Sequence, residues 1–177
     1  KPGRDNDDPA AGRAVLQRRR TFKTMDSEEK AIREVTIGAS PLTLPQIVAV
    51  ARRGVPVRIS QDAVFRERMA QSHRILHESV KAGLPVYGVT TGYGKSCGNR
   101  LDKTVVLNGG GSLMRFHGCG TGEPLGIEEA RASMLCRILC LTRGYSGVSM
   151  ALPERIAEFL NLGITPVIPC EGSVGAS

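Results

Sequence analysis

A glycine-rich segment with two tyrosines stands out as a candidate functional loop. Residues 87–94 read YGVTTGYG and begin with Tyr87. The glycines permit positive φ angles and let the backbone approach a bound molecule closely. The segment lacks the Lys-Ser/Thr ending of a P-loop and the GxGxxG spacing of a dinucleotide site. By itself it therefore predicts only a tight loop that carries phenolic hydroxyls, either as an ordinary turn or as part of a site.

Two pairs of potential metal ligands have helical i, i+4 spacing. His73 and His77 would form half of a metal site, but no acidic or thiol partner accompanies them. Cys136 and Cys140 also lack further ligands nearby, and we interpret them as small buried apolar residues. The cysteine count is five, and an odd number without a signal peptide argues against a disulfide framework. We expect a reduced protein without zinc.

The elements that position these residues are predicted to be mainly helices. The first begins with Thr43 as N-cap, Pro45 in the first turn and Gln46 as the capping-box partner. It should end near Gly54, before an extended piece at residues 55–59.

Three further helices follow from capping residues and helical spacing of apolar residues. The predicted ranges are 61–82, with Ser60 as N-cap and Asp62 in the first turn; 127–143, closed by Gly144; and 153–162, with Pro153 at the first position and Gly163 just past the end.

The composition is that of an ordinary globular protein. Of 177 residues 41% are hydrophobic, and no apolar run approaches the length of a membrane span. The net charge of +7 is spread along the chain, which argues against a nucleic-acid surface. Without the apolar region of a secretory signal, we expect a cytoplasmic protein. Residues 1–36 have the composition of a disordered, charged arm, and residues 37–177 form the remaining domain.

Several separated motifs together resemble one enzyme family. YGVTTGYG is followed by GYSG at residues 144–147, LNLGITP at residues 160–166 and PCEGSVGAS at residues 169–177. This order and spacing resembles the histidine, phenylalanine and tyrosine ammonia-lyases, from about residue 42 to the last residue. The resemblance implies the N-terminal part of their mainly α fold and a homotetramer, with glycine-rich active-site loops. From the composition we expect no nucleic-acid or membrane partner.

The resemblance also implies a chemistry. These enzymes eliminate ammonia from an aromatic L-amino acid and leave the α,β-unsaturated acid. Their electrophile, 4-methylidene-imidazol-5-one, forms from an internal Ala-Ser-Gly, which here assigns Ala176 and Ser177 and requires a glycine after them. By its position in the motif Tyr87 would remove the β-proton, and Gly94 would help the loop to fold over the substrate. Tyr93 stands where the family commonly has Phe, so we expect it to pack.

The segment that would read the substrate's ring gives a mixed signal. By resemblance it contains Leu113, Phe116 and His117, an apolar wall beside a hydrogen-bonding group. Together with Thr90-Thr91 this favours tyrosine, then phenylalanine, then histidine. Alternatively, His117 bonds only the protein's own backbone.

Two departures from the family's pattern leave alternatives open. Gly109–Gly111 replaces part of a helical segment, and Leu139 stands where many members have Asn. A tyrosine or phenylalanine 2,3-aminomutase with the same electrophile remains an alternative, as does an inactive structural homologue.

Overall fold

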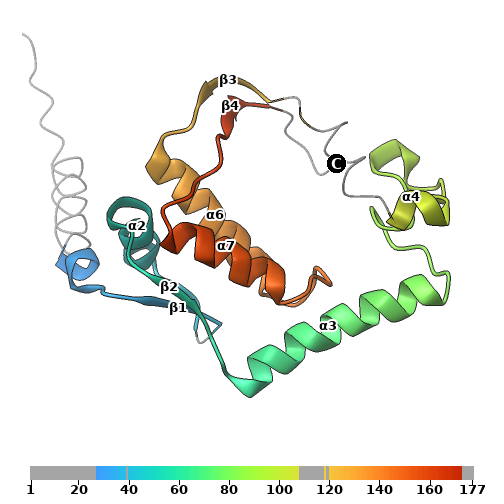
Figure 1. The fold of residues 1–177 in the computed structure, drawn as a ribbon, viewed down its shortest axis with the longest axis horizontal. Helices are drawn as coiled ribbons and strands as arrows, with labels where there is room; N and C mark the ends of the chain where they lie inside the picture. Colours follow the sequence, from blue (N-terminus) through green and yellow to red (C-terminus); the bar gives the residue numbers. More distant parts are fainter. Residues whose placement is uncertain (1–26, 39, 108–117, 119, 173–177) are drawn as a thin grey trace, which may run out of the picture.

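The computed structural model describes residues 27–38, 40–107, 118 and 120–172. The predicted mainly helical architecture is confirmed (Figure 1). The helices are α2 (Leu44–Arg53), α3 (Ala63–Lys81), α4 (Lys103–Leu107), α6 (Ile127–Leu141) and α7 (Ala151–Asn161). Short strands β1 (Val35–Ile37), β2 (Val57–Ile59), β3 (Thr121–Pro124) and β4 (Pro169–Glu171) accompany them. Within the described ranges, no helix is both long and apolar enough to span a bilayer.

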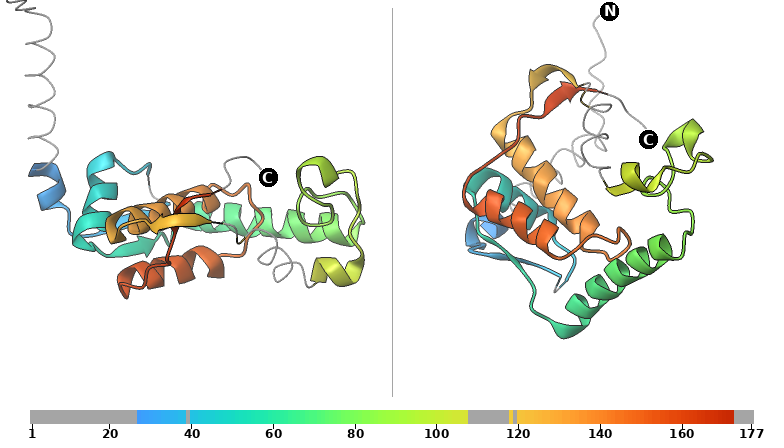
Figure 2. Two further views of the ribbon diagram at one scale, coloured as in Figure 1. Left: turned by 90° about the horizontal axis from the view of Figure 1, so that it is seen from above. Right: turned by 45° about the vertical axis from the view of Figure 1, so that its right-hand side comes forward.

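The hydrophobic core lies between α2, α6, α7 and the pair formed by β1 and β2. The two strands are parallel, with Val35 opposite Val57 and Ile37 opposite Ile59. Their buried side chains join those of α6, such as Leu135, in one cluster. Helix α3 starts at this core and runs away from it to the segment that contains α4 (Figures 1 and 2). The candidate loop, residues 87–94, therefore lies at the outer end of α3.

The first predicted helix has the predicted ends. Thr43 is the N-cap of α2, and its backbone N–H donates to Gln46 Oε1 at 2.8 Å. Gly54 ends the helix in the left-handed region, with φ of 66°. Local sequence signals alone were enough to define this element.

The predicted N-cap of the second helix is wrong. Asp62, not Ser60, caps α3, because its Oδ1 accepts the Phe65 N–H at 2.8 Å. The Ser60 hydroxyl accepts the Asp62 N–H at 3.1 Å and stabilises the turn before the helix. A carboxylate two residues further on reaches the free amide of the first turn, which Ser60 is too distant to do.

The last helix begins earlier than predicted. Helix α7 starts at Ala151, so Pro153 is its third residue rather than its first. Proline is still tolerated there, because amides of the first turn have no helical acceptor. Gly163 follows the end of the helix with φ of 71°, as predicted.

The fold begins before residue 37. Residues 27–31 are helical, and Val35 is fully buried in the core. Arg53 donates to the carbonyl oxygens of Glu29 and Ile32, so this stretch is attached to α2. Residues 1–26 lie outside the described residues, and the expectation of a disordered arm stays a prediction for them.

The interpretation of Cys136 and Cys140 as buried residues is wrong. Both thiols are exposed, because α6 packs into the core through the face that carries Leu135 and Ile138. In the described part of the chain, no three or more His, Cys, Asp and Glu side chains come together in a group that could hold a metal ion.

Candidate functional site

The end of α3 turns sharply into the candidate loop. Gly83 has φ of 68°, and the Leu84 N–H donates back to Ser79 O at 3.0 Å. A left-handed glycine of this kind commonly ends a helix and redirects the chain. The loop thus follows the helix end without a flexible linker.

Two threonines hold the loop in shape from inside. Thr90 Oγ1 accepts the Val86 N–H at 2.7 Å and donates to Leu84 O at 3.2 Å. Thr91, almost fully buried, accepts the Gly88 N–H at 3.3 Å through its Oγ1. These bonds close the loop on itself, which assigns a structural role to residues that sequence reasoning used only to compare families.

The two tyrosines of the loop contact each other and the loop backbone. Their rings meet edge to face, with centroids 6.3 Å apart. The Tyr93 hydroxyl donates to Gly88 O at 3.0 Å, and its ring covers the Gly88 Cα. A Cβ on Gly88 would lie 2.8 Å from that ring, so only glycine fits. Tyr93 thus packs in the loop, as predicted.

The hydroxyl of Tyr87 is fixed in position while its side chain remains accessible. Its oxygen accepts the Gly94 N–H at 3.0 Å, and the residue is 53% exposed. A backbone N–H that donates to a phenolic oxygen stabilises negative charge on that oxygen. The geometry suits a tyrosine that takes up a proton from a bound molecule. It also gives the Gly94 backbone a positioning task that its glycine character alone did not indicate.

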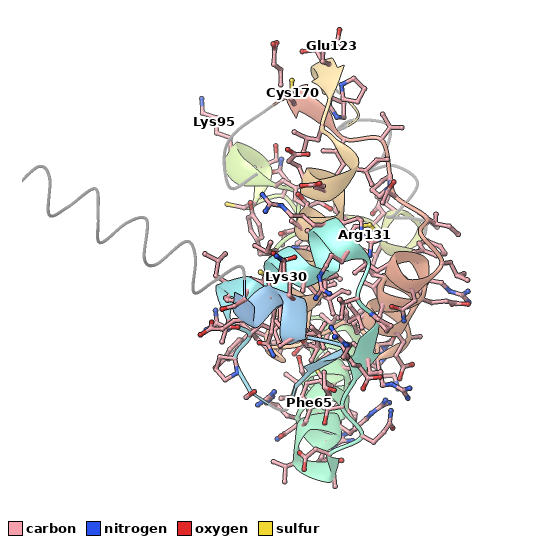
Figure 3. All side chains as sticks on the ribbon, turned by 90° about the vertical axis from the view of Figure 1, so that its left-hand side faces the viewer. Lys30, Phe65, Lys95, Glu123, Arg131 and Cys170 are labelled. Carbon is pink, nitrogen blue, oxygen red and sulfur yellow. The ribbon has the colours of Figure 1, made fainter. Side chains whose placement is uncertain are left out.

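A short antiparallel ladder relates the two other predicted site segments. Thr121 at the start of β3 lies opposite Glu171 at the end of β4. Beyond that pair, a Cβ on Gly172 would lie 3.9 Å from the Gly120 Cα. Figure 3 shows Glu123 and Cys170 of the two strands side by side. Gly120 and Gly172 therefore lie at the same end of the ladder.

This ladder was not predicted, because strands this short, with Gly and Pro in them, have no alternating pattern. It matters because one segment leads to the predicted ring-reading residues and the other to the predicted electrophile precursor. Those residues, Leu113, Phe116, His117, Ala176 and Ser177, lie outside the described residues. Their predicted roles stay predictions, as does that of Tyr87.

The family model for aromatic amino acid lyases matches residues 42–177. The histidine ammonia-lyase of Symbiobacterium thermophilum is 42% identical over 145 residues, which cover 81% of this chain and 28% of the relative. The histidine ammonia-lyase of Treponema denticola is 37% identical and again covered over 28% of its length. The chain thus spans little more than a quarter of these relatives.

Solved structures of related enzymes have the same fold. Ergothionase from Treponema denticola, an ergothioneine-degrading enzyme, matches with a TM-score of 0.74 and 30% identity, over 80% of this chain and 28% of that one. Tyrosine aminomutase from Streptomyces globisporus matches with 0.73 and 34%, over 79% and 26%. These findings confirm the resemblance seen in the motifs. The chain belongs to the aromatic amino acid lyase family and corresponds to its N-terminal portion.

Proposed function

We propose that the protein eliminates ammonia from an aromatic L-amino acid, with Tyr87 as the base that removes the β-proton. The observation that carries this proposal is the hydrogen bond from the Gly94 N–H to the Tyr87 oxygen, in a loop fixed by its own threonines. A general base must be held in one position, and a tyrosine must be ionised to accept a proton. The Gly94 N–H holds the Tyr87 oxygen in one position, and the residue remains accessible to a substrate.

The electrophile of the proposal is 4-methylidene-imidazol-5-one formed from Ala176, Ser177 and a glycine after them. The residue types fit, and the described part of the chain before them ends at Gly172, beside the Gly120 backbone. Such a group would supply a methylene carbon that the substrate's amine can attack, which makes the amine a better leaving group. The described residues contribute the base and the backbone that holds it.

The proposed substrate order is tyrosine, phenylalanine, histidine. His117 offers a hydrogen bond to a phenol or an imidazole, and Phe116 offers an apolar wall. Histidine, the third candidate, has support of its own, since the relatives described above are named histidine ammonia-lyases. The aminomutase alternative has support from the similarity to tyrosine aminomutase. A homotetramer and a cytoplasmic location belong to the same proposal.

The test is an assay of the full-length protein with each of the three amino acids. Elimination produces a conjugated acid whose near-ultraviolet absorbance the substrate lacks, together with free ammonia. We expect the largest rate with tyrosine. A larger rate with histidine would overturn the substrate order only, and a β-amino acid without ammonia would identify the aminomutase. No product from any of the three would overturn the enzymatic proposal.

The base is tested by Tyr87→Phe, with Tyr93→Phe as the matched control in the same loop. Loss of a general base lowers the rate by about 10²–10⁴-fold. Tyr93→Phe removes the hydrogen bond to Gly88 O and keeps the packing ring, so we expect the rate to stay within about threefold, in line with the modest free energy of such a bond. Equal effects of the two substitutions would contradict the assignment of Tyr87.

A further inference from the structure

The middle of α3 is bonded to the connection between α6 and α7. The Gly147 N–H donates to Ser72 Oγ at 3.1 Å, and the Gly147 carbonyl oxygen lies 2.8 Å from His73 Nδ1. A carbonyl oxygen only accepts, so Nδ1 of His73 carries the hydrogen. The backbone N–H and the carbonyl oxygen of Gly147 are thus both hydrogen-bonded to adjacent side chains of α3.

The fit around Gly147 is close as well as polar. Its φ is 64°, and a Cβ there would lie 2.7 Å from Leu76 Cδ2. One turn earlier in α3, Arg68 reaches the Thr142 carbonyl oxygen at 3.5 Å. The contact therefore extends along α3 and fixes the position of this helix along its axis relative to the end of α6.

From this contact an unbroken series of backbone elements leads to Tyr87. Helix α3 continues to Lys81, and the Ala82 N–H still donates to Glu78 O at 2.8 Å. Next comes the turn at Gly83, whose following residue, Leu84, is bonded to Thr90. A rotation or slide of α3 at His73 would thus be transmitted to the Tyr87 loop rather than absorbed on the way.

We propose that Ser72 and His73 are positioning residues, which place the Tyr87 loop relative to the core by holding α3 against Gly147. The inference rests on the proposed function and adds residues to it that lie outside the loop. His77 contacts the His73 ring edge to face, with centroids 4.4 Å apart, and supports its orientation. The i, i+4 histidines thus pack against each other. Of the two, His73 has the positioning role, because its Nδ1 is bonded to the Gly147 carbonyl oxygen.

The experiment compares His73→Phe with His73→Asn in the full-length protein. An asparagine amide can occupy the place of Nδ1–H and donate to the same carbonyl, whereas phenylalanine keeps the ring without the donor. We expect His73→Phe to lower kcat by about tenfold to a hundredfold, since a displacement of about 1 Å at the reacting groups has effects of that size. His73→Asn should stay within a few-fold of wild type. Gln71→Ala, at an exposed position of the same helix, is the control and should change kcat little.

A double-mutant cycle separates positioning from general destabilisation. If His73 acts through Tyr87, His73→Phe should lower the residual rate of Tyr87→Phe by less than about threefold, because the group being placed is already absent. Hydrogen exchange should rise at residues 86–101 in His73→Phe and stay unchanged in α2. Hydrogen exchange tests the positioning role even when the residual activity is too low to measure.

The outcomes distinguish the two proposals. The same factor of loss in both backgrounds, or no rescue by His73→Asn, overturns the positioning role while Tyr87 remains the base. Wild-type protein without activity, or an active Tyr87→Phe, overturns the proposed function and with it the positioning role.

Discussion

Arg131 is buried and bonds two helices besides its own. It belongs to α6 and is labelled in Figure 3. Only 7% of its surface is exposed. Its Nε donates to Val50 O and its Nη1 to Leu160 O, each at 3.0 Å. These carbonyls lie in the last turns of α2 and α7, where the helix dipole favours a cation. One side chain thus holds the ends of two helices against a third.

The replacement Arg131→Met keeps most of the packing volume and removes both hydrogen bonds. A hydrogen bond to a charged group makes a net contribution of about 1.5–3 kcal/mol to the free energy of unfolding. Val50 O would lose the Arg131 donor, and the Gly54 N–H does not replace it because that group bonds Ala49 O. Leu160 O would keep the Gly163 N–H at 3.2 Å, so its loss is smaller. The expected destabilisation is therefore about 3 kcal/mol, near the lower end of the sum for two bonds.

Native-state hydrogen exchange measures the destabilisation by Arg131→Met separately in each helix. A loss of about 3 kcal/mol corresponds to roughly a hundredfold faster exchange of the protected amides in the last turns of α2 and α7. The matched control is Arg52→Met, which removes the exposed ion pair with Glu128 between α2 and α6. Its side chains are 58% and 59% exposed, so the effect should stay below about 1 kcal/mol. Equal exchange in the two variants would refute the role of Arg131.

Two further predictions concern the loop and the start of α3. Gly88→Ala should reduce activity strongly, because its Cβ would lie 2.8 Å from the Tyr93 ring. The control is Gly83→Ala, which has the same φ of 68° but nothing within 4 Å of the added Cβ and should reduce activity little. Rate measurements on both variants check this, and similar losses would contradict it. Asp62→Ala should lower the free energy of unfolding by about 1 kcal/mol, since the N-cap bond to the Phe65 N–H is lost; an unchanged melting temperature would contradict the assigned cap.

Local signals in the sequence predicted the elements whose ends depend on neighbouring residues. The capping box of Thr43 and Gln46, the left-handed Gly54 and the glycine after α7 are all properties of a few consecutive residues. The same reasoning failed at Ser60, where two capping residues stand close together and only the exact start of the helix decides between them.

Contacts between distant segments could not be predicted from such signals. The burial of Val35 depends on its pairing with Val57, and the exposure of Cys136 depends on which face of α6 the core takes. The ladder of β3 and β4 follows from the approach of two segments with no strand pattern of their own. Each is decided by packing between residues far apart in the chain, about which local propensity says little.

The candidate site divides in the same way. The sequence by itself determined the family and the type of residue at each proposed position, because motif order and residue identity are written in the chain. Only the tertiary structure decided that the Gly94 N–H meets the Tyr87 oxygen and that His73 holds Gly147. The reason is physical: a hydrogen bond needs two groups within about 3 Å in a suitable direction, and folding alone brings them there.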